Sequence, residues 1–76
     1  MQMRYEDYIE INPAIRFGKP CIQGTRISVQ DILEMLAGEM TFADIIEEFP
    51  QLDVQKIRAA LSFAASRERN AKMVAA

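Results

Sequence analysis

A helix start signal occurs three times between residues 27 and 57. Each copy has an apolar residue, then a side chain that can cap a helix, and an isoleucine four positions after the cap. The capping oxygen accepts from the first free backbone N–H groups, and the two apolar side chains close over the first turn. We therefore predict helices that begin just after residues 28, 41 and 53. The three copies are Ile27-Ser28-Ile32, Met40-Thr41-Ile45 and Leu52-Asp53-Ile57.

The apolar spacing gives each helix one buried face. Positions 29, 32, 33 and 36 of the first helix, and 42, 45, 46 and 49 of the second, follow the i, i+3, i+4, i+7 pattern of a helical stripe. Gly38 and Pro50 are the expected stops. The third helix is expected from Val54 to about Arg69. Its expected inward side chains are Val54, Ile57, Leu61, Ala64 and Ala65.

Three short helices with connections of three or four residues predict a mainly α fold. We expect a homeodomain-like three-helix bundle over residues 28–69, whose second and third helices form a helix-turn-helix. The chain has 76 residues and is expected to be a single domain, 1–76, with a thin core. The alanine-rich tail over residues 70–76 is expected to fray.

A segment rich in glycine, proline and basic residues precedes the bundle, and we expect it to form strands and a hairpin over residues 8–27. Ile9–Ile11, Cys21–Ile22 and Arg26–Ile27 are typical of short strands, with Gln23-Gly24 as the turn. Because so few strands are not stable alone, we expect them to pair with a second copy across a twofold axis. The motif residues are Gly18, Lys19, Pro20, Gly24, Thr25 and Arg26.

The sequence predicts a cytoplasmic protein without membrane contact. No apolar run approaches the roughly 18 residues of a membrane span, and the N-terminus lacks an apolar signal-peptide core. The lone Cys21 excludes an internal disulfide and fits a reducing compartment.

Catalytic residue patterns are missing from the sequence. It contains no histidine, its one cysteine has no base to activate it, and its carboxylates lack metal-ligand spacing. We therefore expect a binding protein and not an enzyme, with no cofactor, no metal and no small-molecule substrate.

The net charge of −2 is unevenly distributed. Residues 28–53 hold seven acidic side chains and no basic one, whereas residues 54–76 hold five basic side chains and one acidic one. Net acidity opposes nonspecific binding to nucleic acid, but a basic end permits a local phosphate-facing surface. The first turn of a second helix in a helix-turn-helix meets DNA. The DNA-binding candidates are Gln55, Lys56, Arg58, Ala59 and Ser62.

Phe63 is an anomaly, because helical stepping places it opposite the centre of the expected inward stripe. An exposed aromatic side chain often marks a contact, so Phe63, Arg67 and Ile22 are candidates for a partner or dimer interface. The alternative is that the N-terminal strands cover Phe63. Lys19, Thr25 and Arg26 offer donors for phosphate or partner contact; alternatively, Thr25 and Arg26 brace the hairpin against the first helix.

The motif and its continuation resemble the domain of unknown function 433 family, over about residues 8–69. Many members have a glycine where this chain has Phe17, and another directly before Met-Thr where it has Glu39. The backbone before Lys19 and the end of the first helix are therefore expected to differ. The matching segments are Gly18–Ile27, Met40-Thr41, Ile45–Phe49, Pro50–Asp53 and Ile57–Leu61.

The resemblance implies homeodomain-like modules, many encoded beside PIN-like nuclease toxins. It leads to the hypothesis of an antitoxin-like homodimer that covers a PIN-like ribonuclease toxin and binds operator DNA. The alternative hypothesis is a protein-interaction module that uses the helix-turn-helix only as a scaffold and does not bind DNA.

Overall fold

Two of the three helix starts form complete capping boxes in the computed structural model. The structure describes the backbone of residues 4–75 and the side chains of residues 4–69. Ser28 exchanges hydrogen bonds with Asp31, and Thr41 does so with Asp44. At the third start, the Lys56 backbone N–H donates to Asp53 Oδ1 at 2.9 Å. The resulting helices are α1 (Val29–Ala37), α2 (Phe42–Glu48) and α3 (Val54–Ala75).

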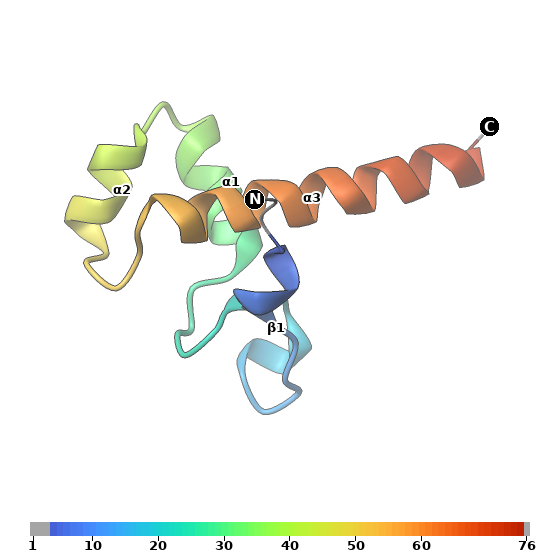
Figure 1. Ribbon diagram of the computed structural model, residues 1–76, viewed down its shortest axis with the longest axis horizontal. Helices are drawn as coiled ribbons and strands as arrows, with labels where there is room; N and C mark the ends of the chain where they lie inside the picture. Colours follow the sequence, from blue (N-terminus) through green and yellow to red (C-terminus); the bar gives the residue numbers. More distant parts are fainter. Residues whose placement is uncertain (1–3, 76) are drawn as a thin grey trace.

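The helix α3 is longer than predicted, because its backbone continues through Ala75 instead of ending near Arg69. Its first half packs against α1 and α2, whereas its second half projects away from the rest of the molecule (Figure 1). The tail expected to fray covers residues 70–76. Its side chains, and all of residue 76, lie outside the described residues. The bundle therefore has one helix with a free half.

The N-terminal element forms its sheet within one chain. Strand β1 (Ile9–Glu10) pairs antiparallel with β2 (Cys21–Ile22), with Ile9 opposite Ile22. On the other side of β2, the Ile22 N–H donates to the Ile27 carbonyl at 2.9 Å, and Cys21 bridges to Ser28. Strand β2 thus has neighbours on both sides in its own chain. The prediction that these strands pair with a second copy is wrong for β2.

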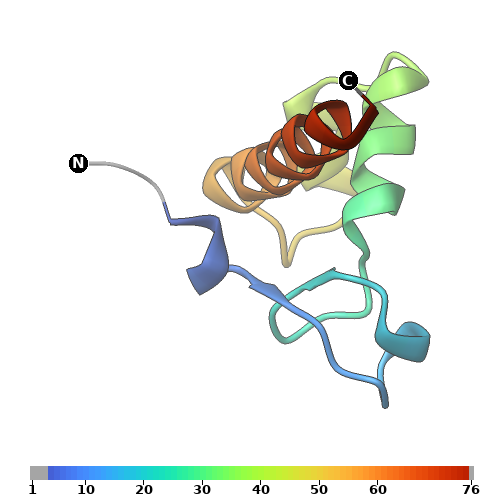
Figure 2. The ribbon, with the colours of Figure 1, turned by 90° about the vertical axis from the view of Figure 1, so that its right-hand side faces the viewer.

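The core lies where the sheet, α1, α2 and α3 meet. Figure 2 shows the sheet and its loops on one side of the helices. The staple isoleucines Ile32, Ile45 and Ile57 are each 0% exposed, as the start signals predicted. Ile22 is 1% exposed and belongs to this core, so its assignment to a partner or dimer interface is wrong. Ile22 lies between β1, its partner strand, and the segment Ile27–Ser28, and this place buries it within the chain.

Three successive residues adopt left-handed backbone conformations at the tip of the N-terminal element. They are Arg16, Phe17 and Gly18, at φ 52°, 60° and 83°, in the short turn η2 (Arg16–Gly18). Left-handed conformations favour glycine. The Phe17 side chain is nevertheless fully exposed. The backbone at Phe17 is therefore strained, and no packing of the Phe17 side chain compensates for this strain.

The end of α1 is a Schellman motif. The Met40 N–H donates to the Met35 carbonyl and the Glu39 N–H donates to the Leu36 carbonyl, both at 3.1 Å. Glu39 takes the left-handed position at φ 73°, whereas Gly38 has φ −84°. The helix stop therefore depends on Glu39 and not on the flexibility of Gly38.

Candidate protein-interaction site

The predicted DNA-binding set divides when it is placed on α3. Gln55, Arg58 and Ser62 are exposed. Ala59 is 0% exposed and lies in the core, so its assignment to DNA contact is wrong. The Lys56 Nζ donates to the Gln51 carbonyl at 2.8 Å, so this lysine folds back on the loop before α3. The start of α3 therefore presents one free-standing cation, Arg58, among the described residues of this set.

The helix α3 is rotated relative to the prediction. Ile57, Ala59 and Ala60 face the core, whereas Val54 and Leu61 are 44% and 37% exposed. The cause is the short helix η1 (Tyr5–Asp7), which contacts α3 beside α1. Alanines at positions 59 and 60 let these segments approach closely. The inward stripe predicted from α3 alone is thus wrong at Val54 and Leu61, and also at the exposed Ala65.

Phe63 is half-buried under the N-terminal segment of its own chain. The Tyr5 ring meets it edge-on with ring centroids 5.6 Å apart, and the Tyr5 hydroxyl donates to Ser66 Oγ at 3.3 Å. On its other side, the Arg67 guanidinium lies 5.2 Å from the centre of the Phe63 ring. The alternative that the N-terminus covers Phe63 therefore holds, with η1 and not a strand as the cover.

An open groove of about 590 Å³ lies between α1 and α3 next to this aromatic cluster. Its walls are mainly apolar, from Pro20 of the hairpin motif, two side chains of α1 and two of α3. Polar and charged side chains occupy the rim. The groove therefore brings together Pro20, Phe63 and Arg67, which the sequence had placed in two separate candidate sets. The lining residues are Pro20, Val29, Gln30, Leu33, Phe63, Ala64, Arg67 and Glu68.

The hairpin motif is architectural over most of its length. The Thr25 hydroxyl donates to the Ile22 carbonyl at 2.9 Å and accepts from the Ile27 N–H at 3.0 Å, which closes the turn. Gly24 sits in this turn at φ 77°, and its N–H donates to Glu10 Oε1. Lys19 and Arg26 are exposed. Thr25 thus stabilises the turn itself, and the expected bracing of the hairpin against α1 by Thr25 is wrong.

Arg16 provides the link between the hairpin and α1, and the sequence analysis missed it. One guanidinium nitrogen, Nη1, donates to the Arg26 carbonyl at 2.7 Å and to Asp31 Oδ2 at 2.9 Å. The left-handed turn η2 directs Arg16 back toward α1. The sequence has no pattern that predicts a left-handed conformation at an arginine, so this contact could not be predicted. We call the Arg16–Asp31 pair the clasp.

The clasp and the capping box together lower the pKa of Asp31. Partial burial favours the neutral acid, but the Ser28 backbone N–H and the Arg16 guanidinium stabilise the carboxylate and outweigh it. Hydrogen bonding to Asp31 likewise raises the pKa of Arg16. The Asp31 carboxylate therefore has a structural role.

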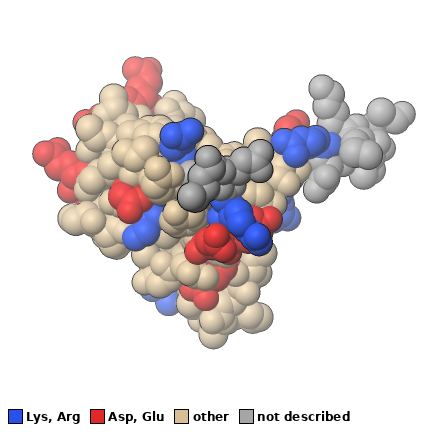
Figure 3. All heavy atoms as spheres, viewed as in Figure 1, with Lys and Arg blue, Asp and Glu red and all other residues tan. Residues whose placement is uncertain are grey.

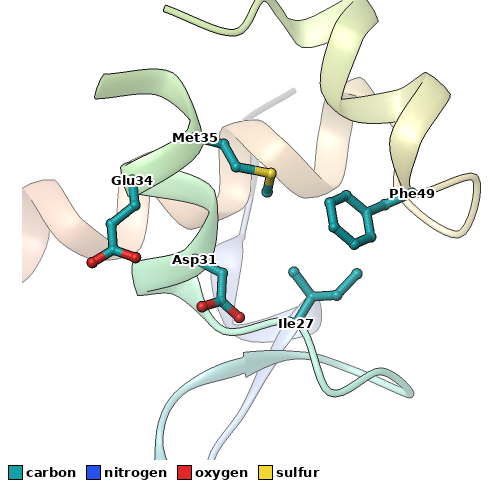
Figure 4. Close-up of a pocket in the computed structure, with 5 residues that line it drawn as sticks. All are labelled: Ile27, Asp31, Glu34, Met35 and Phe49. Carbon is teal, nitrogen blue, oxygen red and sulfur yellow. The ribbon is translucent and has the colours of Figure 1, made fainter. Parts of the chain in front are cut away.

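A smaller hollow of about 360 Å³ lies on the other side of α1 (Figure 4). Met35 and Phe49 point toward each other across it, above Ile27. Its two carboxylates are engaged, because Asp31 is in the clasp and Glu34 accepts from Gln30 Nε2 at 3.2 Å. This hollow therefore offers little for a ligand to recognise.

Within the described residues, no group of three or more His, Cys, Asp or Glu side chains is arranged to hold a metal ion. No helix in that part of the chain has the length and apolar character needed to cross a bilayer. Acidic side chains gather over the end of the molecule that α2 forms (Figure 3).

Comparison with known proteins gives three matches. A family model described as "Protein of unknown function (DUF433)" matches residues 9–64. The uncharacterized protein y4eO of Sinorhizobium fredii (strain NBRC 101917 / NGR234) is 33% identical over 58 residues, which are 76% of this chain and 26% of that protein. The crystal structure of a DUF433 member protein from Anabaena variabilis ATCC 29413 has a TM-score of 0.77 at 21% identity, over 93% of this chain and 71% of that chain.

Proposed function

Since this chain belongs to the DUF433 family of proteins of unknown function, we propose that it is a cytoplasmic binding module of the antitoxin type. It acts by contact with a protein partner, a PIN-like ribonuclease toxin, and without catalysis of its own. The partner binds at the groove between α1 and α3.

The open apolar groove is the observation that carries this proposal. Val29, Leu33 and Ala64 line it, and an apolar concavity with few convergent polar groups is typical of a binding site. Arg67, stacked on Phe63 at its rim, supplies a cation to an acidic partner surface. Aromatic and arginine side chains are the common anchors of protein interfaces.

The small fraction of the Sinorhizobium protein that this chain matches also supports a binding module. This chain spans 26% of the length of the Sinorhizobium protein that it resembles. A domain that recurs as a fraction of a longer chain suits a role in recognition, which can be joined to other domains.

Operator DNA is the second candidate ligand. The exposure of Gln55, Arg58 and Ser62 on one face of α3 favours it. Three features oppose it: Ala59 is buried, Lys56 folds back, and acidic side chains cover neighbouring α2. Phosphate contacts supply most of the affinity for DNA, and this face offers few cations for them.

Co-expression of the full chain with the product of the neighbouring gene, which the proposal expects to be a PIN-like nuclease, tests the proposal. We expect the chain to relieve growth arrest and to co-purify with the nuclease. Arg67→Glu should weaken the complex about tenfold or more, because it places like charge against an acidic partner. Arg69→Glu is the matched control, since it makes the same charge change two residues away and about 200° around the helix.

If Arg67→Glu and Arg69→Glu weaken the complex equally, the loss reflects the net charge of the helix. The groove would then not be the binding site. A nuclease that remains toxic and does not co-purify with the wild-type chain would refute the antitoxin role. A gel shift with the promoter fragment of the same operon, at low salt, decides whether DNA is a ligand too.

A further inference from the structure

The outward face of α3 carries an apolar stripe that the bundle does not use. Val54, Leu61 and Ala65 are exposed, although the core would accept side chains of this type. On the opposite side of α3, Ala59 and Ala60 are 0% exposed. The uncovered parts of these side chains therefore lie on the outer side of α3, and Leu61, at 37% exposed, keeps part of its surface free for a further contact. The helix has 22 residues, and its second half projects away from the bundle (Figure 1).

The stripe follows the spacing of a two-helix interface. Along one line it contains Val54, Arg58, Leu61, Ala65 and Glu68, at intervals of four, three, four and three residues. This alternation averages 3.5 residues, which is the repeat that keeps one seam of a helix against a partner helix. All five residues are exposed. We call this line the outer seam.

We propose that the outer seam is a homodimer interface, in which α3 of one copy packs antiparallel on α3 of a second copy. In this register Leu61 lies opposite Ala65 of the second copy, and Arg58 lies opposite Glu68 of the second copy. The twofold axis repeats both pairs. A large side chain thus meets a small one, and a cation meets a carboxylate.

The charges on the seam select the second copy and its direction. In a parallel pair, Arg58 would face Arg58 and Glu68 would face Glu68, which is repulsive at both ends. In the antiparallel pair, the same four side chains form two opposite-charge contacts. Self-complementarity of this kind is what an isologous interface requires.

The dimer would cover the face of α3 that carries Arg58 and leave open the groove that carries Arg67. Homodimerisation and DNA binding by α3 are then mutually exclusive. Glu68 also lines the groove, so the dimer and a partner in the groove share this one side chain, whereas Pro20, Val29, Leu33 and Phe63 stay accessible to the partner. The dimer proposal does not depend on the identity of the groove's partner. Because only three apolar side chains supply the seam, we expect a dissociation constant of about 10 µM, as for a small interface.

Sedimentation equilibrium of the full chain tests the proposal. The protein concentration is varied from about 1 to about 200 µM at about 0.05 M salt, where charge pairs are weakly screened. We expect a monomer–dimer equilibrium. Arg58→Glu and Glu68→Arg should each weaken it about tenfold or more. The double variant Arg58→Glu/Glu68→Arg should restore it to within about threefold, because each contact is then re-formed with reversed charge.

Arg67→Glu is the control, since it makes the same charge change on the groove side of α3. A wild-type chain that is monomeric at about 200 µM overturns the proposal. A double variant that dimerises no more tightly than either single variant overturns it as well. Leu61→Asp should abolish the dimer with unchanged circular dichroism, because Leu61 is already 37% exposed in the monomer. If Leu61→Asp fails to fold, the charge-swap set still decides.

Discussion

At the scale of single residues, two substitutions at left-handed positions distinguish this chain. Phe17 and Glu39 have φ values of 60° and 73°, and the family resemblance leads us to expect glycine at both positions. Any residue other than glycine is strained in this conformation because its Cβ approaches the backbone. The sequence could show that a glycine was missing, but only the backbone shows that the left-handed turn is kept without it.

We predict that Glu39→Gly and Phe17→Gly each raise the free energy of unfolding by about 0.5–1 kcal/mol. Glycine relieves the strain, and the Phe17 side chain is fully exposed, so its removal costs no packing. Urea denaturation measures the effect. Lys19→Gly is the control: Lys19 has φ −66°, so glycine there adds only unfolded-state entropy and should lower stability. A loss of stability in Glu39→Gly would contradict the strain interpretation.

At the scale of elements, the clasp ties the N-terminal turn η2 to the start of α1. Arg16 joins Asp31 at 2.9 Å, and Asp31 also completes the capping box with Ser28. The pKa of Asp31 lies below its ordinary value of 3.8 in the folded chain. A group with a lowered pKa stabilises the fold above its unfolded-state pKa, and this stabilisation is lost as pH falls through the folded-state pKa.

We therefore predict that the wild type loses more stability than Asp31→Asn between about pH 5 and about pH 2. The asparagine cannot take up a proton in this range, so its unfolding free energy should depend less on pH. Urea denaturation at a series of pH values measures the difference. Parallel curves for the two proteins would show that the clasp does not contribute through the Asp31 charge.

Local signals were enough to predict the helix starts, but not the rotation of α3. Caps and staples act within one turn, and so Ile32, Ile45 and Ile57 were found in the core as predicted. The face of α3 that becomes buried depends on η1, which comes from residues 5–7 and has no periodic pattern. Ala59 was misplaced for this reason, and so were Val54 and Leu61.

At the scale of the whole molecule, our two proposals assign different sides of α3 to different contacts. The groove side joins Pro20 of the hairpin motif with Phe63 and Arg67 of α3, and sequence patterns named these residues without showing that they meet. The outer side carries the seam. If both proposals hold, α3 contributes to a partner site and to a dimer interface that share Glu68.

The chemical-shift map of the isotope-labelled chain, titrated with the nuclease that our proposal expects to co-purify with it, locates the partner directly. Our proposal predicts that the largest backbone amide shifts fall at Val29, Leu33, Phe63 and Ala64, around the groove. The residues at the start of α3, Gln55, Arg58 and Ser62, should move little. Shifts confined to the start of α3, with the groove unaffected, would contradict the proposal that the groove is the binding site.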